Sequence, residues 1–288
     1  VKTTGTRARL FNAQGMLHDL SRTSNNPLSL SAKEKAWILA NPVITVGINP
    51  DISPFEFIDH HGDFSGMSSG FIQLIAQRTG LKINVRKDLS WTEIIDHAKA
   101  GDIDILPAIV RSIEKQSYLD FVPPHISYPM VILVAPNKMP LHTSDDLKGK
   151  KVIIIDNEIN PSMLRNNHPG IEIIPAKNMT HALQLLSSGS ADALLGNLPQ
   201  INESIEKSGY SKLRMTGITE YEYALSIGVT KGRPILSRIL GKAINSITED
   251  ERQAIRDRWV TLEHPHGLGL INLTLIILVS LFFLSIML

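Results

Sequence analysis

The sequence predicts an α/β fold in which two similar lobes each contain a parallel sheet covered by helices. Short apolar segments without strict polar–apolar alternation recur along the chain, as in strands buried on both faces. Amphipathic segments of helical periodicity separate them. The segments 97–106 and 185–195 share one plan: a helix end, a glycine, two further residues and then an aspartate ahead of an apolar strand. The matching pairs are Gly101 with Asp104 and Gly189 with Asp192.

Helix-start and helix-stop signals define the elements of the first half. Ser31 with Glu34 and Ser90 with Glu93 form two capping-box patterns, which predict helix starts. Gly80 predicts a helix end. In order, we expect a short helix ending near Ala40, a strand over 43–48, a helix over 66–79, a strand over 82–87, a helix from Ser90 to Ala100 and a strand over 102–109.

The second half repeats this alternation. Strands are expected over 130–136, 151–156, 172–176, 192–197 and 224–229. Helices are expected over 161–167, 180–188, 198–208, 234–247 and 249–259. Apart from the short helix that ends near Ala40, all of these elements lie within residues 42–262, which we therefore expect to form the folded domain.

Composition excludes several function classes. The 29 Lys and Arg nearly balance the 28 Asp and Glu, so no basic field marks a nucleic-acid partner. The absence of cysteine excludes disulfides, thiolate metal sites and a cysteine nucleophile. Ser112 and Lys115 match a Ser-x-x-Lys pattern but lack its companion motifs. His60 and His61 are paired without a matching acidic cluster. We therefore predict no catalytic residue, no metal site and no cofactor.

The two ends of the chain differ from the domain between them. Residues 1–41 are read as a linker or the end of a preceding domain, followed by the short helix. Residues 267–288 contain no charged side chain and are dominated by Leu, Ile, Val and Phe. A helix that spans a bilayer needs roughly 20 such residues. We therefore predict a transmembrane helix over 267–288, and expect the chain to continue beyond Leu288.

Several motifs in one order carry a family resemblance. The strings ITVGINPDISPFEFIDHHGDFSG, SWTEIIDHAKAGDIDI and EKQSYLDFVPPHISYPMVILV are followed by DDLKGKKVIII and ALQLLSSGSADALLGN. From about Pro42 to Trp259 the chain resembles the bacterial extracellular solute-binding proteins of family 3. The resemblance implies a two-lobed, periplasmic-binding-protein-like (Venus flytrap) fold. Lobe 1 is expected over 42–134 and 226–262, and lobe 2 over 137–223.

The order of the domain and its apolar tail resembles one subset of that family. In unorthodox sensor histidine kinases and related diguanylate cyclases, the last flytrap helix leads into a transmembrane helix. The resemblance implies a periplasmic ligand-sensing domain on a single-pass inner-membrane receptor. It further implies a homodimer, a small-molecule ligand and an output domain outside this chain. Two alternatives stay open: a membrane-anchored solute-binding protein of an importer, and the non-catalytic flytrap part of a lytic transglycosylase-like enzyme.

The positions that hold an amino-acid ligand in the family differ here. Amino-acid-binding members bind the ligand carboxylate with an arginine that lies six residues before a phenylalanine in a strand. That phenylalanine matches Phe121, so the position is Lys115, which offers a point charge and no bidentate fork. The ligand amino group meets an aspartate five residues after the second-lobe aspartate. Counted from Asp192, that position is Asn197, which is neutral.

Further departures point the same way. The glycine–threonine–threonine turn of the family is replaced by Asn157-Glu158-Ile159, where Glu158 would repel an anion. Ile52 stands where an aromatic lid is usual. Trp91 is retained and could pack on a ligand, and Arg111 is a further cation near the expected cleft. The sequence therefore predicts a ligand that is not a standard L-amino acid.

Overall fold

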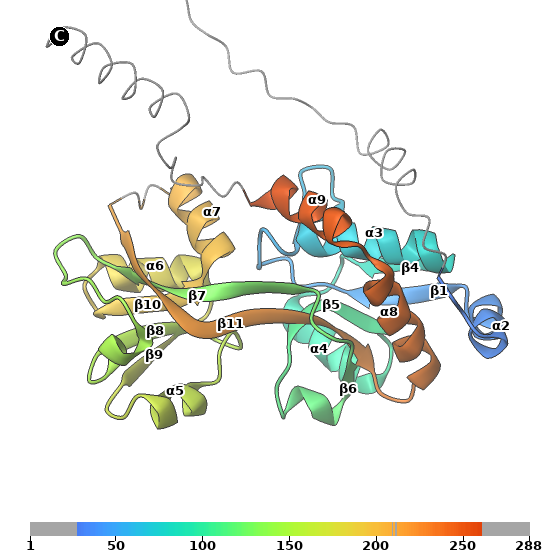
Figure 1. The fold of residues 1–288 in the computed structure, drawn as a ribbon, viewed down its shortest axis with the longest axis horizontal. Coiled ribbons are helices and arrows are strands. Elements are labelled where there is room, and N and C mark those ends of the chain that lie inside the picture. Colours follow the sequence, from blue (N-terminus) through green and yellow to red (C-terminus); the bar gives the residue numbers. More distant parts are fainter. Residues whose placement is uncertain (1–27, 209, 211, 261–288) are drawn as a thin grey trace, which may run out of the picture.

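The described part of the chain forms two lobes joined by two long strands (Figure 1). The computed structural model describes residues 28–208, 210 and 212–260. Lobe 1 contains α2 (Ala32–Ala40), β1 (Val43–Gly47), β2 (Phe57–Ile58), β3 (Phe64–Ser65), α3 (Met67–Thr79), β4 (Lys82–Arg86), α4 (Trp91–Ala100), β5 (Ile105–Val110), the 3-10 helix η1 (Lys115–Ser117), β6 (Leu119–Phe121), α8 (Pro234–Ser246) and α9 (Glu249–Trp259). Lobe 2 contains η2 (Ser144–Leu147), β8 (Lys151–Ile155), α5 (Pro161–Asn167), β9 (Glu172–Ala176), α6 (Met179–Ser187), β10 (Ala193–Asn197) and α7 (Leu198–Ser208).

The same βαβαβ unit builds both lobes. In lobe 1, β1 lies between β4 and β5 and is parallel to both. In lobe 2, β8 lies between β9 and β10 with the same direction and order. Helices connect the strands in each unit, as right-handed crossovers between parallel strands require. The prediction of an α/β fold with two similar lobes is therefore confirmed.

The two glycine–aspartate pairs occupy equivalent places. Gly101 directly follows α4 and Gly189 follows α6 after one further residue, and both adopt positive φ angles, of 90° and 78°. The Asp104 carboxylate accepts the backbone N–H of Thr45 at 2.7 Å, and the Asp104 N–H donates back to the Thr45 carbonyl. In lobe 2, Asp192 forms the same pair of hydrogen bonds with the backbone of Lys151.

Lys151 is the first residue of β8. Its backbone N–H donates to the Asp192 carboxylate at 3.0 Å, and its carbonyl accepts from the Asp192 N–H. A basic side chain completes each arrangement: Arg233 lies 2.6 Å from Asp104, and Lys138 lies 2.9 Å from Asp192. Each aspartate therefore ties the strand after a helix to the first strand of its own unit.

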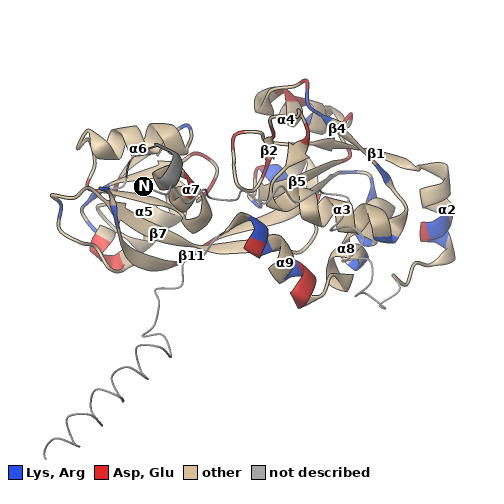
Figure 2. Cartoon of the chain, turned by 90° about the horizontal axis from the view of Figure 1, so that it is seen from above, with Lys and Arg blue, Asp and Glu red and all other residues tan. Residues whose placement is uncertain are grey.

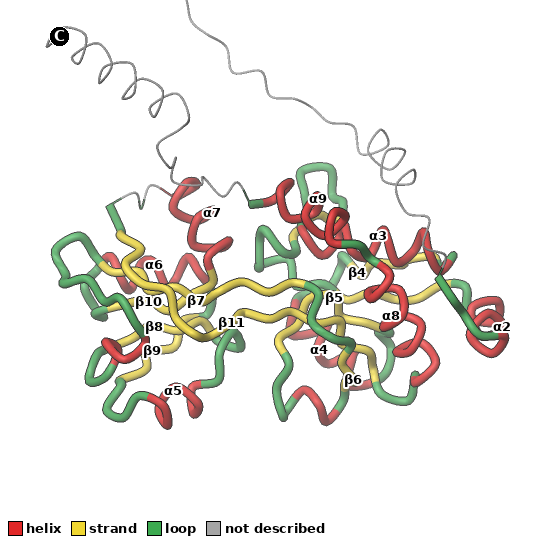
Figure 3. The backbone as a smooth tube through the Cα atoms, viewed as in Figure 1, coloured by secondary structure: helices red, strands yellow, loops and turns green. Residues whose placement is uncertain are grey.

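Two long antiparallel strands, β7 (Ile126–Val134) and β11 (Arg214–Thr230), pass through both lobes (Figure 3). The end of β11 pairs with β5 and β6 in lobe 1. β7 pairs with β10, a strand of lobe 2, from Met130 to Leu133. The result is one nine-stranded mixed sheet in the order β4-β1-β5-β11-β7-β10-β8-β9, with β6 beside β11.

The mixed sheet differs from the separate parallel sheets expected from the apolar pattern. An apolar run carries no information on strand direction, so β7 and β11 could not be recognised as antiparallel. The first half of β11 was also missed, because its exposed positions carry Glu220 and Glu222 and break the apolar pattern. The short strands β2, β3 and β6 have only two or three residues each and leave no periodicity to detect.

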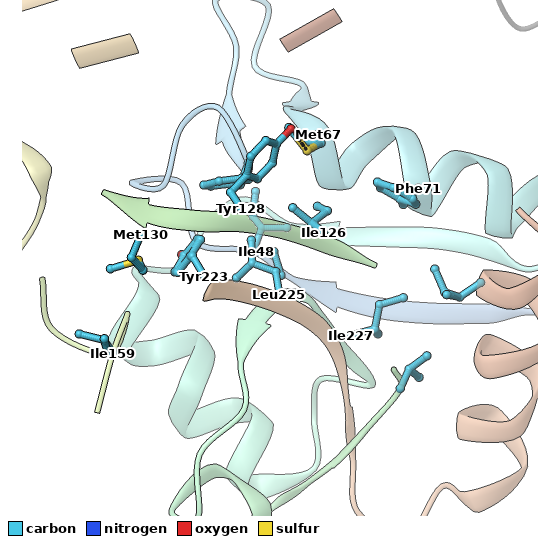
Figure 4. Close-up of a cluster of buried hydrophobic side chains, with 14 of the residues drawn as sticks. Ile48, Met67, Phe71, Ile126, Tyr128, Met130, Ile159, Tyr223, Leu225 and Ile227 are labelled. Atoms are coloured by element: carbon cyan, nitrogen blue, oxygen red, sulfur yellow. Dashed lines mark hydrogen bonds between the residues drawn. The ribbon is translucent and has the colours of Figure 1, made fainter. Parts of the chain in front are cut away.

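One apolar core follows the crossing strands from one lobe to the other. Tyr128 and Met130 on β7 and Tyr223 on β11 belong to the same buried cluster as residues of both lobes (Figure 4). Phe55 is fully buried, with its ring centroid 5.3 Å from Tyr223 and 6.0 Å from Tyr128. Ile159 reaches this cluster from lobe 2. The strands that join the lobes are therefore packed, not merely connecting, segments.

The last described helix, α9, is fixed to lobe 1. Thr248 and Glu251 form a capping box at its start, and the Glu251 carboxylate pairs with Arg78 of α3 at 2.6 Å. Both side chains of that pair are nearly buried, and Nη2 of Arg78 donates to both carboxylate oxygens of Glu251. A hydrogen bond between charged groups is stronger than one between neutral groups. Acidic side chains at the start of α9 and basic ones at its end suit the helix dipole (Figure 2). α9 therefore moves with lobe 1.

The predicted transmembrane helix, residues 267–288, lies outside the described residues, as does the linker over residues 1–27. Within residues 28–208, 210 and 212–260, none of the helices is both long and apolar enough to cross a bilayer.

Candidate functional site

A cleft of about 390 Å³ lies between the two lobes. The carboxyl ends of the parallel strands β1 and β5 point into it from lobe 1, and those of β8 and β9 from lobe 2. In open α/β sheets, ligands bind at the carboxyl ends of the strands. The lining residues are Asn49, Asp51, Ile52, Trp91, Thr92, Ile95, Asp96, Lys99, Ala108, Ile109, Val110, Glu114, Lys115, Tyr118, Ile155, Asp156, Asn157, Glu158, Lys177, Asn178, Met179, Gln200 and Tyr223.

The wall formed by lobe 1 contains three of the residues expected from the sequence. Trp91 is the first residue of α4, and the capping box of Ser90 and Glu93 fixes the start of that helix beside the cleft. The Lys115 ammonium is buried and donates to the Val110 carbonyl at 3.2 Å. Burial lowers the pKa of Lys115. Ile52 lies in the loop after β1.

A buried carboxyl group holds that loop in place. Glu56 is 1% exposed, and its Oε2 atom accepts the backbone N–H of Asn49 at 2.9 Å. Desolvation raises the pKa of Glu56 well above its usual value. Sequence reasoning did not single out Glu56. The available signal was an acidic residue flanked by Phe55 and Phe57 within an otherwise apolar segment.

The wall formed by lobe 2 is built around Glu158. Asn157 has a φ of 67°, a left-handed conformation that asparagine tolerates better than most residues. The turn after β8 that it forms places Glu158 at the cleft with only 6% exposure. Burial raises the pKa of Glu158 to about 8, against a smaller lowering by the hydrogen bond from Asn197. The group is therefore largely protonated at neutral pH.

Asn197 lies behind Glu158 and does not line the cleft. It is fully buried at the end of β10, and its Nδ2 donates to Glu158 Oε2 at 3.1 Å and to Gln200 Oε1. Its Oδ1 accepts the Gln200 backbone N–H at 3.1 Å. Both amide hydrogens and one oxygen lone pair are thus in use, so Asn197 positions Glu158 and has no hydrogen left for a ligand.

Arg111 also lies away from the cleft lining. Its exposed guanidinium stacks over the Phe121 ring at 5.9 Å. The structure thus brings Ile52, Trp91, Lys115 and Glu158 to one cleft and leaves Arg111 and Asn197 outside it.

Two tyrosines line the cleft that the sequence did not single out. Tyr118 follows η1, and the Lys99 ammonium lies 5.6 Å from its ring centroid. Tyr223 lies on β11, where burial raises the pKa of its hydroxyl well above the usual value. Neither could be found from sequence, because each reaches the cleft only through tertiary packing.

The lobes contact each other at Ser53 and Glu203. Ser53, in the loop after β1, donates its hydroxyl proton to the Glu203 carboxylate on α7 at 2.7 Å. Because the two residues belong to different lobes, this hydrogen bond forms only while the lobes are close. Among residues 28–208, 210 and 212–260, no cluster of His, Asp and Glu is suited to hold a metal ion.

A two-lobed fold with a cleft between the carboxyl ends of its strands is the arrangement of a solute-binding protein. The model of the bacterial extracellular solute-binding proteins, family 3, matches residues 44–262. The chain belongs to this family. Family 3 domains bind ligands and do not catalyse reactions, which accounts for a cleft lined by packing and hydrogen-bonding groups.

Two sensors are among the family 3 relatives of this chain. The virulence sensor protein BvgS of Bordetella pertussis is 27% identical over 230 residues, which are 80% of this chain and 19% of BvgS. The sensor protein EvgS of Escherichia coli K12 is 26% identical over 239 residues, which are 83% of this chain and 20% of EvgS. The chain therefore spans about a fifth of the length of these sensors.

A solved structure and a solute-binding protein are also similar to this chain. The crystal structure of the periplasmic VFT2 domain of BvgS matches with a TM-score of 0.72 at 27% identity, covering 81% of this chain and 99% of that domain. The L-cystine-binding protein TcyJ of Escherichia coli K12 is 25% identical over 219 residues, which are 75% of this chain and 82% of TcyJ. Family 3 relatives of this chain thus include both sensors and solute-binding proteins.

Proposed function

We propose that this chain is the periplasmic ligand-sensing domain of a single-pass inner-membrane receptor. The observation that carries the proposal is the match to nearly the whole VFT2 domain of BvgS, a sensor protein. The receptor signals as a homodimer, and its output domain, a histidine kinase or a diguanylate cyclase, lies beyond Leu288. Residues 267–288 form the membrane-spanning segment in this proposal.

The geometry suggests how the cleft state would reach the membrane. The Arg78–Glu251 pair couples α9 to lobe 1, and α9 ends at Trp259, eight residues before the apolar segment. A change in lobe separation about β7 and β11 therefore alters where lobe 2 lies relative to α9. A ligand shifts this equilibrium only by its difference in affinity for the open and closed forms.

A cross-link across the cleft tests the proposal. The chain contains no cysteine, so Ser53→Cys and Glu203→Cys introduce the only two thiols into it. In the full-length receptor, joining them with a short bismaleimide should hold the lobes together and fix the phosphorylation or cyclase output at one level. Each single-cysteine variant, treated in the same way, serves as the matched control. Output that stays equal in cross-linked and control receptors contradicts sensing through the cleft.

The second candidate is a membrane-anchored solute-binding protein of an importer. It is favoured by TcyJ, of which the chain covers 82%. In that case the same cross-link should abolish uptake of the solute by a reconstituted importer and leave no signalling output to change.

The cleft residues lead to a prediction about ligands. Lys115 lacks the bidentate geometry of arginine, Ile52 offers no aromatic face and Asn197 is fully used within lobe 2. Glu158 repels a ligand carboxylate once it ionises as the pH approaches 8. We expect calorimetric titration with the common L-amino acids to show no binding at micromolar concentrations. A clear heat of binding for any one of them would contradict this interpretation of the cleft.

A further inference from the structure

Glu158 lines the cleft, and its carboxyl is buried without a cationic partner among the described residues. It is 6% exposed, and Asn197 is its only hydrogen-bonding partner among the described side chains. Asn197 and Gln200, which lie against it, are neutral, and no lysine, arginine or histidine of the described residues forms an ion pair with it. A buried carboxylate without a counter-charge is costly, so a cationic ligand can supply what lobe 2 lacks.

The rest of the cleft suits a positive group. Three aromatic side chains line it from three different elements: Trp91, Tyr118 and Tyr223. Aromatic faces beside an acidic group are the usual recognition elements for small organic cations. The further acidic residues of the lining are Asp51, Asp96, Glu114 and Asp156, and its lysines are Lys99, Lys115 and Lys177.

The three lysines do not neutralise Glu158. Lys99 stacks over Tyr118, and Lys177 is exposed on the loop after β9. The buried Lys115 ammonium is held by the Val110 carbonyl on the opposite wall, in lobe 1. Lys115 is therefore the charge that would oppose a cation, and its replacement is an informative test.

We propose that the cleft binds a small organic cation of the alkylammonium type, with its ammonium group on the Glu158 carboxylate and its carbon atoms against the aromatic side chains. This inference rests on the proposed function only in taking the cleft as the ligand site. When the cation binds, Glu158 releases its proton to solvent. The ammonium group keeps its protons and donates a hydrogen bond to Glu158 Oε1 or Oε2. The raised pKa of Glu158, about 8, means that this release accompanies binding at neutral pH.

A series of probes matched in size tests the proposal on the 288-residue chain in detergent micelles. Butylamine, butanol and butyrate have similar size and differ in charge, and ligand-observed NMR titration measures their affinities. We expect butylamine to bind at least about tenfold more tightly than the other two. Butyrate or butanol binding as tightly as butylamine, or no binding of butylamine, overturns the proposal.

Three variants locate the cation. Glu158→Gln keeps the acceptor for Asn197 and should weaken butylamine binding about tenfold or more. Lys115→Met removes the opposing charge and should leave butylamine affinity equal or higher. Asp250→Asn, at an exposed acidic residue of α9 that does not line the cleft, is the matched control and should change affinity less than about twofold, because exposed charges are screened. Weaker butylamine binding in Lys115→Met, or unchanged binding in Glu158→Gln, overturns the proposal.

The proton provides a readout that is independent of signalling. Calorimetry in two buffers with different ionisation enthalpies should report proton release on butylamine binding at pH 7, and none in Glu158→Gln. Butylamine affinity should rise as the pH approaches 8. If the receptor output responds to the Ser53–Glu203 cross-link but butylamine does not bind, the ligand class is wrong and the sensing function stands. If butylamine binds and the output does not respond to the cross-link, the ligand class stands and the sensing function is wrong.

Discussion

Lobe 1 and lobe 2 repeat one βαβαβ unit, yet they use the segment after the first strand differently. In lobe 1 the connection from β1 to α3 is long and contains the β2–β3 hairpin, and its buried carboxyl, Glu56, faces inward and holds the loop. In lobe 2 the connection from β8 to α5 is a tight turn, and its buried carboxyl belongs to Glu158, which lines the cleft. The comparison teaches that the strands fix where the cleft is, whereas the strand-end loops decide which groups a ligand meets.

The largest expected effect concerns the apolar residues that follow these two strands. Phe55 is fully buried against Tyr128 and Tyr223, whereas Ile159 reaches the same core at 9% exposure. Phe55→Ala should lower the free energy of unfolding by about 3–5 kcal/mol, and Ile159→Ala by about 2 kcal/mol. Urea denaturation followed by tryptophan fluorescence measures both. Equal losses would show that the two loops support the core alike.

The next effect is the dependence of the free energy of unfolding on pH that arises from Glu158 in lobe 2. The pKa of Glu158 is raised from 4.5 to about 8, so the folded state binds a proton that the unfolded state has released. The contribution of Glu158 to stability is therefore fully present below pH 4.5 and is lost as the pH rises toward 8, by at most about 1.4 kcal/mol per pH unit. Glu158→Gln should remove this slope, so that the variant gains on the parent chain between pH 5 and 8.

Urea midpoints at several pH values, with the exposed Glu114→Gln as the control, test this difference. Glu56 should add a slope of the same sign, because burial raises its pKa as well. A stability difference between Glu158→Gln and the parent chain that does not change with pH would mean that Glu158 stays ionised in the folded state.

The smallest effect tests the repeated aspartates. Asp104 and Asp192 make equivalent hydrogen bonds, but the pair of Asp104 with Arg233 is shorter and less exposed than that of Asp192 with Lys138. Asp104→Asn should cost about 2 kcal/mol and Asp192→Asn about 1 kcal/mol of unfolding free energy. Thermal or urea unfolding measures both, and a larger loss for Asp192→Asn would reverse this ranking.

Local signals in the sequence were sufficient for most of the fold. The capping boxes at Ser31 and Ser90 begin α2 and α4 where predicted. Gly80 ends α3 and Gly101 ends α4, both with positive φ angles. The aspartates after Gly101 and Gly189 correctly indicated two units built alike. These features depend on residues close in sequence, so a single sequence contains them.

The site could be predicted only in part. Ile52, Trp91, Lys115 and Glu158 line the cleft, whereas Asn197 is turned behind Glu158. Sequence spacing places a residue at the end of a strand but does not say which way its side chain turns once a neighbouring strand end competes for the same space. Tyr118 and Tyr223 were out of reach for the same reason. Their burial depends on residues far away in the chain.

Lobe movement relative to a fixed α9 is the central claim, and pulsed electron paramagnetic resonance tests it most directly. Spin labels at Ile113→Cys and Met139→Cys, both exposed and in different lobes, report the lobe separation. Labels at Ile113→Cys and Asp250→Cys report the distance from lobe 1 to α9. Glu203→Ala, which removes the contact with Ser53, should shift the first distance distribution and leave the second unchanged. No shift between the lobes, or an equal shift of α9 against lobe 1, would contradict the account.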